Sequence, residues 1–498
     1  MKRLAWFVIV GALAAGAAAL SAETLAPQFM PADHRALTRT ISYAEMESFL
    51  KSVDGTGPVR VSVEATTARG RSLYLVHLRR GDHPTWKILF YAQQHGDEIS
   101  GKDALLYLIR DIARDPRQLP EDVDLWILPM MNPDGAEAGT RVNSAGADLN
   151  RDHITLEQPE TLALHQVVRR VRPDVAVDCH EFGRDPKAWA KRGWSKWADV
   201  TMDSLNNPLF DPALMAAAER RLAGVAHAET KSGHRFLRYW VGGVPPDDEQ
   251  RHSAPDIDSA MNAVGTYGGL SFIVEVAAGP DEAIPRELGN RVDAYLVVFR
   301  YLLRDDGGRT GDLATIRQAR TRTLPPFLPI NYLWVNPKAA VTHFPVIEVA
   351  TGRRAEIATA NMMTEVAVKK TAPTPLAYAV DPRAASEIGA LLDRHGIPYE
   401  RLTAPRSVNA ESCTLLRLEN EFDDVYSRYE GRQIARREPQ ATRELPPGTL
   451  WVPLTGDTAQ RAALLLEPSA MYGIYQYPRF RALAVDGEAL PVLRIVRY

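Results

Sequence analysis

Short apolar runs alternate with helix-like segments over roughly the first 300 residues of the chain. Apolar and polar positions alternate through residues 59–63 and 72–78, a pattern typical of half-buried strands. Continuous apolar runs at 86–91, 123–128 and 270–276 indicate strands that are buried on both faces. Apolar residues at helical spacing predict helices at residues 43–50, 105–112, 159–171 and 292–303.

This alternation predicts an α/β domain over residues 23–305, with a mixed, largely parallel central sheet flanked by helices. Gly and Pro interrupt residues 306–330, which we interpret as a linker. The remainder, residues 331–498, contains short alternating strands and one clear helix, which Asp381 caps and Gly396 ends. We expect this part to form a smaller, β-rich α+β accessory domain, to which the sequence assigns no role.

The N-terminus has the layout of a secretory signal peptide, predicted to span residues 1–22. Lys2 and Arg3 precede an almost unbroken apolar stretch that ends in the small residues Ser21 and Ala22. Cleavage there predicts a secreted or periplasmic protein with no stable membrane span. The alternative is an uncleaved anchor, because an apolar stretch of about 17 residues can just cross a bilayer.

The charge of the chain limits which partners it can bind. The formal net charge of −3 and the lack of any dense Lys/Arg block argue against a nucleic-acid partner.

Cys179 and Cys413 are the two cysteines, and an oxidising compartment would permit a disulfide between them. We expect buried free thiols instead, because the two residues lie in different predicted domains.

The predicted metal ligands are His95, Glu98 and His180. His95 and Glu98 are three residues apart directly after the strand at 86–91, so both side chains can face one point. His180 ends the predicted strand that begins at Val175, and imidazole nitrogen and carboxylate oxygen are ligands that zinc prefers. Other histidines compete for the third position but lie on turn, helix or loop patterns, namely His153, His165, His234 and His252.

Four segments together resemble the zinc carboxypeptidase family of metallopeptidases, also called funnelins. They are HGDE at 95–98, ADLNRD at 147–152, DCHE at 178–181 and the strand that reaches Glu275. The resemblance extends over about residues 40–305 and implies the zinc carboxypeptidase fold for the α/β domain.

The resemblance also implies a role for each residue of the metal centre. One zinc ion per chain is held by His95, Glu98 and His180, the two histidines and one glutamate that characterise this family. Asp148 lies two residues before Asn150 and resembles the carboxylate that orients the ring of His95.

The same resemblance implies the residues that bind and process the substrate. Asn150 and Arg151 resemble the pair that binds a free C-terminal carboxylate, for which a guanidinium fork is well suited. Arg141 resembles the arginine that contacts the scissile carbonyl and stabilises the oxyanion. Glu275 resembles the general base that takes a proton from the zinc-activated water.

The expected activity is therefore zinc-dependent removal of C-terminal residues from a peptide or peptide-like substrate with a free carboxylate. One alternative is a zinc amidohydrolase that acts on murein peptides or acylated amino acids. Another is a non-catalytic peptide-binding relative. The family's mobile tyrosine stays unassigned, because Tyr267 is expected to pack in a turn and Tyr239 is the other candidate.

Overall fold

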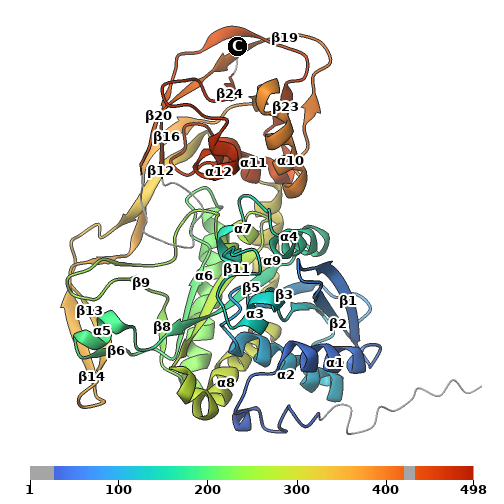
Figure 1. Cartoon of the computed structure of the whole chain (residues 1–498), viewed down its shortest axis with the longest axis vertical. Helices are drawn as coiled ribbons and strands as arrows, with labels where there is room; N and C mark the ends of the chain where they lie inside the picture. The colour runs from blue at the N-terminus through green and yellow to red at the C-terminus, as the bar shows by residue number, and fades with distance from the viewer. Residues whose placement is uncertain (1–26, 420–431, 497–498) are drawn as a thin grey trace, which may run out of the picture.

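The computed structural model describes residues 27–419 and 432–496, and its largest element is an eight-stranded sheet (Figure 1). In sheet order its strands are β1 (Val59–Thr66), β2 (Ser72–Arg79), β4 (Val123–Leu128), β3 (Trp86–Ala92), β5 (Val175–Gly183), β11 (Leu270–Ala278), β7 (Val200–Ser204) and β8 (Phe236–Arg238). The central strands β4, β3, β5 and β11 run parallel to one another. Antiparallel neighbours β2 and β7 flank them, so the sheet is mixed as predicted.

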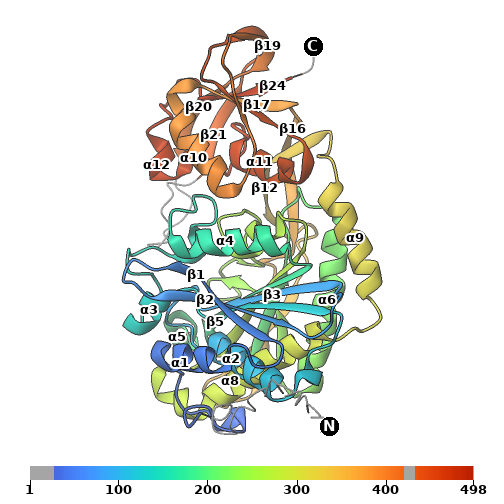
Figure 2. The same ribbon diagram turned by 90° about the vertical axis from the view of Figure 1, so that its right-hand side faces the viewer.

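Helices cover both faces of this sheet, as Figure 2 shows. The buried apolar side chains of α1, α2, α6 and α8 form one continuous core with one face of the sheet. Those of α4 and α7 form a smaller core on the other face. The covering helices span Tyr43–Val53 (α1), Ser100–Arg114 (α2), Pro159–Val171 (α4), Pro212–Lys231 (α6), Ala260–Gly265 (α7) and Ile284–Leu303 (α8). The predicted α/β architecture is therefore confirmed.

The C-terminal part of the chain forms a second, antiparallel sheet at the top of Figure 1. Its strands, in sheet order, are β18 (Glu400–Arg401), β23 (Leu450–Pro453), β17 (Ala377–Val380), β24 (Val492–Ile495), β19 (Arg406–Glu411) and β22 (Ala441–Leu445). Helix α10 (Ala385–His395) lies at the predicted place. It ends at Gly396, whose φ of 64° is left-handed and favours glycine.

Two segments connect the sheets. Residues 306–330, predicted to be a linker, contain helix α9 (Arg309–Thr321), which contacts α6. After it, β12 (Phe327–Val335) pairs with β16 (Glu365–Pro373) in a ribbon that runs down from the C-terminal sheet (Figure 1). The division into a catalytic domain, a linker and an accessory domain stays a prediction.

The ribbon leads to a side lobe, in which segments far apart in sequence pair with each other. Strand β6 (Trp194–Lys196) pairs antiparallel with β13 (Thr342–Glu348), which also pairs with β14 (Arg354–Thr359). Trp189 and Phe344 pack together in the apolar core of this lobe. A segment from the predicted accessory region thus completes a structure that begins in the α/β domain.

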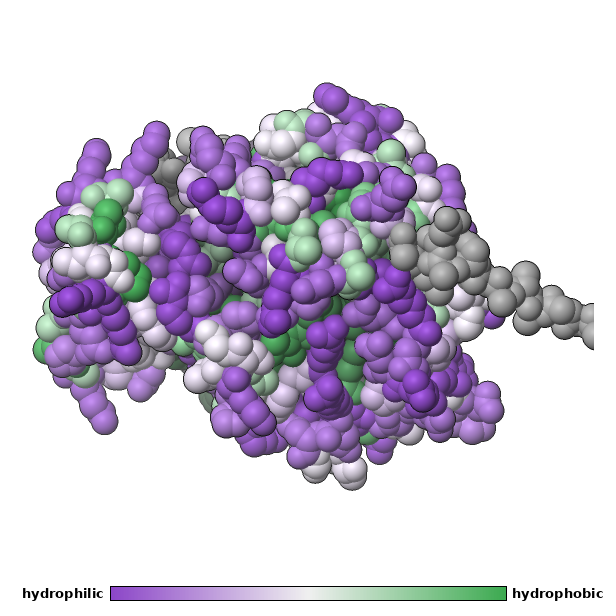
Figure 3. Space-filling model, turned by 90° about the horizontal axis from the view of Figure 1, so that it is seen from below, coloured by the Kyte–Doolittle hydropathy of each residue, from purple (hydrophilic) through white to green (hydrophobic). Residues whose placement is uncertain are grey.

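The predicted signal peptide lies outside the described residues. Within the ranges 27–419 and 432–496, no helix is both long and apolar enough to cross a membrane. Figure 3 shows hydrophilic side chains over most of the face that lies at the bottom of Figure 1.

The two cysteines provide a first test of the fold. Both are buried and free, as the sequence predicts, and burial raises the pKa of Cys179 and raises that of Cys413 to about 12. Because the thiolate is the reactive species, we expect neither thiol to react with a thiol reagent in the folded protein. After unfolding without reductant, two thiols per chain should be titrated. Fewer than two would show that the cysteines form a disulfide.

Candidate metal centre and active site

The three predicted metal ligands converge on one point. The Nδ1 atom of His95 lies 2.7 Å from Oε1 of Glu98, and the Nδ1 atom of His180 lies 2.8 Å from Oε2 of the same carboxylate. The two Nδ1 atoms are 3.1 Å apart. His95 and Glu98 lie in the loop after β3, and His180 lies on the neighbouring parallel strand β5, so adjacent strand ends build the site.

A carboxylate also contacts the far nitrogen of each imidazole. Oδ1 of Asp148 lies 3.2 Å from Nε2 of His95, which is the arrangement predicted for this residue. Oδ2 of Asp178 lies 2.9 Å from Nε2 of His180. Such contacts fix the tautomer and orientation of a metal-binding histidine. This role of Asp178 was not predicted from the sequence, although a spacing of two residues on one strand places Asp178 on the same face as His180.

The electrostatics of this cluster favour a cation. Burial alone would lower the pKa of His180, but Asp178 and Glu98 outweigh it and raise that pKa well above its usual value. Burial also raises the pKa of Glu98, yet the imidazoles of His95 and His180 hold it below its usual range. Positive charge is therefore stabilised where the ligand atoms meet. Two imidazole nitrogens and a carboxylate form a known catalytic zinc donor set, so these residues fit zinc.

The competing histidines lie elsewhere, each with other partners. His153 contacts Gln94 at 2.9 Å and His165 at 3.0 Å in the interior. His234 pairs with Glu229 at 2.6 Å, remote from the cluster. His252 contacts the backbone carbonyl of Tyr239 and packs against the ring of Trp240, so His180 is the histidine that completes the site.

Arg141 reaches the edge of the metal centre. Its Nε and Nη2 atoms lie 3.0 and 2.9 Å from Oδ2 of Asp148. Its Nη1 atom lies 3.6 Å from Oε1 of Glu98 and 3.1 Å from Nδ1 of His95. The guanidinium also lines the adjacent cavity, so it can reach an oxygen of a bound substrate. Its position is compatible with the predicted contact to a scissile carbonyl.

Asn150 and Arg151, the pair predicted to bind the C-terminal carboxylate of the substrate, differ in their surroundings. Oδ1 of Asn150 accepts a hydrogen bond from the backbone amide of Ala260 at 2.8 Å, and its Nδ2 atom lies 3.2 Å from Nε2 of His180. The amide of Asn150 is thus engaged within the protein. Arg151 lines the cavity, with Nε 3.9 Å from Oδ2 of Asp258. We therefore expect Arg151 to contribute most of the carboxylate recognition.

Glu275 faces the same cavity from the next strand. It lies on β11 opposite His180 of β5 on one side and Thr201 of β7 on the other. Burial raises the pKa of its carboxyl group, and the charge of Glu98 adds to this shift, whereas His180 opposes it. A carboxyl group with a raised pKa beside a metal site has the property expected of a general base.

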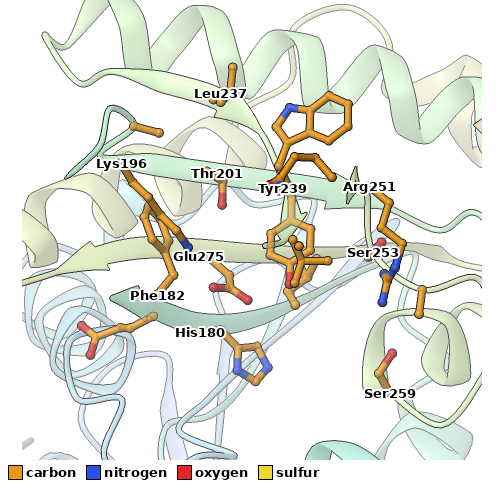
Figure 4. Close-up of a pocket in the computed structure, with 18 of the residues that line it drawn as sticks. His180, Phe182, Lys196, Thr201, Leu237, Tyr239, Arg251, Ser253, Ser259 and Glu275 are labelled. Carbon is orange, nitrogen blue, oxygen red and sulfur yellow. The ribbon is translucent and has the colours of Figure 1, made fainter. Parts of the chain in front are cut away.

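The cavity in front of the metal centre has a volume of about 460 Å³, within the range of small-molecule and peptide sites. Figure 4 shows His180 and Glu275 near its middle, with Lys196 and Phe182 at one end and Arg251, Ser253 and Ser259 at the other. The side lobe supplies further lining residues, all missed by sequence analysis: Trp189, Lys196, Trp197, Phe344 and Pro345. No local pattern marks them, because strand pairing across the lobe brings them to the cavity.

Tyr267 and Tyr239, the two tyrosines considered for the family's mobile tyrosine, lie in different places. The hydroxyl group of Tyr267 contacts Nδ1 of His165 at 2.9 Å inside the apolar core on the α4 side of the sheet. This is the packing role expected for it. Tyr239 instead lines the cavity, where burial raises the pKa of its hydroxyl group (Figure 4).

The contact between Asp178 and His180 generates a test of the metal centre. Asp178→Asn keeps the size of the side chain but removes the charge that holds the imidazole. We expect zinc affinity, measured by competition with a chelator, to fall about 10- to 100-fold. Asp185→Asn, a change at an exposed residue beyond the end of β5, is the matched control and should leave affinity unchanged. Equal affinities in the two variants would contradict the role of Asp178.

Comparisons with known proteins agree with this geometry. Residues 46–185 match the family model described as Zinc carboxypeptidase. The chain is 24% identical to carboxypeptidase 2 of Trichophyton equinum over 434 residues, which cover 80% of this chain and 75% of that protein. It is 28% identical to carboxypeptidase 2 of Trichophyton tonsurans over 187 residues, 36% of this chain and 35% of that protein.

Among solved structures, a metallo-carboxypeptidase from Pseudomonas aeruginosa is 28% identical, with a TM-score of 0.40, and the match covers 52% of this chain and 69% of that one. The segment that matches the family model contains His95, Glu98 and His180, whose ligand atoms meet in the structure. Residues 46–185 of the chain therefore belong to the zinc carboxypeptidase family of metallopeptidases.

Proposed function

We propose that this protein is a zinc-dependent carboxypeptidase that removes C-terminal residues from peptides. The observation that carries the proposal is one shared cavity: the converging atoms of His95, Glu98 and His180 face it, as do the carboxylate of Glu275 and the guanidinium of Arg151. Such a cavity can hold a metal, a proton acceptor and a substrate carboxylate at once.

The residues divide the work of amide hydrolysis between them. A bound zinc ion would supply an acidified water and polarise the scissile carbonyl. Glu275 accepts a proton on its carboxylate from the attacking water and delivers it to the nitrogen of the leaving amine. Arg141 donates to the carbonyl oxygen as negative charge develops on it. Arg151 binds the terminal carboxylate and so selects the last peptide bond.

We also propose an extracytoplasmic location for this activity. The signal-peptide pattern of residues 1–22 supports it. The peptides of a secreted or periplasmic environment would then be the available substrates, and fractionation of the expressing cells tests this location directly.

The role of Glu275 can be tested separately from metal binding. Glu275→Gln keeps the shape of the side chain but cannot accept a proton. We expect zinc content to be retained and kcat to fall at least about 10²-fold, the usual loss when acid–base catalysis is removed. Glu282→Gln, at an exposed position after the same strand, is the control and should retain full activity. Near-normal turnover of the Glu275 variant would identify another group as the base.

Recognition of the terminal carboxylate distinguishes a carboxypeptidase from other zinc hydrolases. A charge-assisted hydrogen bond contributes about 1.5–3 kcal/mol. Amidation of the peptide C-terminus should therefore lower kcat/KM roughly tenfold to a hundredfold for the parent enzyme. In Arg151→Ala the same amidation should have much less effect, since groups in direct contact are non-additive.

The control for this comparison is Arg353→Ala, which changes an exposed arginine of the side lobe. It should show the same sensitivity to amidation as the parent. If the parent cleaves free and amidated peptides equally well, the carboxypeptidase proposal is wrong. An endopeptidase or a cell-wall amidase would then be the better description of the zinc site.

A further inference from the structure

Lys196 brings an ammonium group into the cavity, where burial lowers its pKa and the charge of Glu275 opposes that shift. Its Nζ atom lies 4.9 Å from the ring centroid of Phe182 and 5.9 Å from that of Trp189. Within the described part of the chain, no carboxylate forms a hydrogen bond or ion pair with this ammonium group. Cation–π contacts leave its three N–H donors available, so a ligand in the cavity can accept from them.

The position of Lys196 relative to Asn150 and Arg151 indicates which part of a substrate this lysine contacts. Nε of Arg151 lies 3.9 Å from Oδ2 of Asp258, and Asn150 accepts from the backbone amide of Ala260, so both residues lie beside the segment 258–260. Figure 4 labels Ser259 of this segment. Lys196 lies at the opposite end, with His180 and Glu275 in between (Figure 4).

This arrangement fixes the direction of a bound peptide. If its terminal carboxylate is at Arg151 and its scissile carbonyl is at the metal centre, the residue before the scissile bond extends toward Lys196. Aromatic side chains, including Trp189 and Phe344, line the cavity at this end. They can pack against an aliphatic stem whose tip reaches the ammonium group.

The other charges of the cavity bear on whether an acidic substrate residue can bind near Lys196. Glu275 lines the cavity, and its carboxylate would repel an acidic substrate residue. The charge of Glu98 would be compensated by a bound metal ion. Of the lining arginines, Arg141 lies at the edge of the metal centre and Arg251 at the end opposite Lys196 (Figure 4). The ammonium group of Lys196 can reverse the repulsion from Glu275, because a buried charge-assisted contact is worth more than a screened one.

We propose that Lys196 determines specificity by binding a carboxylate on the substrate residue that precedes the scissile bond. The enzyme then prefers peptides with an acidic penultimate residue. This inference rests on the proposed carboxypeptidase function, because the direction of the peptide depends on it.

The test uses two peptides that differ only at the penultimate residue, glutamate in one and glutamine in the other. We expect the parent enzyme to favour the glutamate peptide by at least about tenfold in kcat/KM. Lys196→Met should abolish or invert this preference, because the repulsion from Glu275 remains. Lys196→Arg should restore it. Lys191→Met, an exposed lysine on helix α5 (Lys187–Lys191), is the matched control and should keep the parent preference.

Three outcomes would overturn the inference. The parent could cleave both peptides equally well, which would leave the proposed function intact. Lys196→Met could slow both peptides by the same factor, which would mean that the lysine acts only on Glu275. If the parent cleaves neither peptide, the proposed function fails instead. The inference is then judged by the affinity of both peptides for Glu275→Gln, measured by calorimetry, and equal affinities would overturn it.

Discussion

Concentrated buried charge is the constraint on which the rest of this structure depends. The carboxylate of Glu98 lies within 2.8 Å of two imidazole nitrogens, and Asp148 and Asp178 stand behind those imidazoles. Such a cluster is costly in a protein interior unless a cation compensates it. Parallel strands make the cluster possible, because β3 and β5 end side by side and bring His95 and His180 together.

Polar contacts continue behind the cluster into the interior. Gln94 donates from its Nε2 atom to the carboxylate of Asp178, and its Oε1 atom accepts a hydrogen bond from Nε2 of His153 at 2.9 Å. His153 contacts His165, which contacts the hydroxyl group of Tyr267. The guanidinium of Arg461, from the C-terminal part, lies 3.9 Å above the ring of that tyrosine. Arg461 lies on helix α11 (Ala459–Leu466), so a helix of the C-terminal part contacts the row of polar groups behind the metal centre.

The substrate cavity has a divided origin. The metal ligands and Arg151 lie within the segment that matches the family model, whereas Arg251, Ser253 and Ser259 at the same end come from a later segment. The other end is formed by the side lobe, where β13 pairs with β6 and places Phe344 near Lys196. The side lobe thus adds lining residues that are distant in sequence from the metal ligands, because a strand pair joins two distant segments.

The sequence by itself predicted β1 to β5, β11 and the helices α1, α2, α4, α8 and α10, but not β7, β8 or α6. It also predicted the three residues whose ligand atoms meet. Burial patterns are local, so the run before His95 predicts a buried strand, and a spacing of three places Glu98 beside that histidine. Only the tertiary structure decided that Asn150 is hydrogen-bonded to the backbone of Ala260 and that Lys196 and Phe344 line the cavity. These facts depend on pairing between distant strands and on competition for hydrogen-bond partners, neither of which leaves a periodic signal in the sequence.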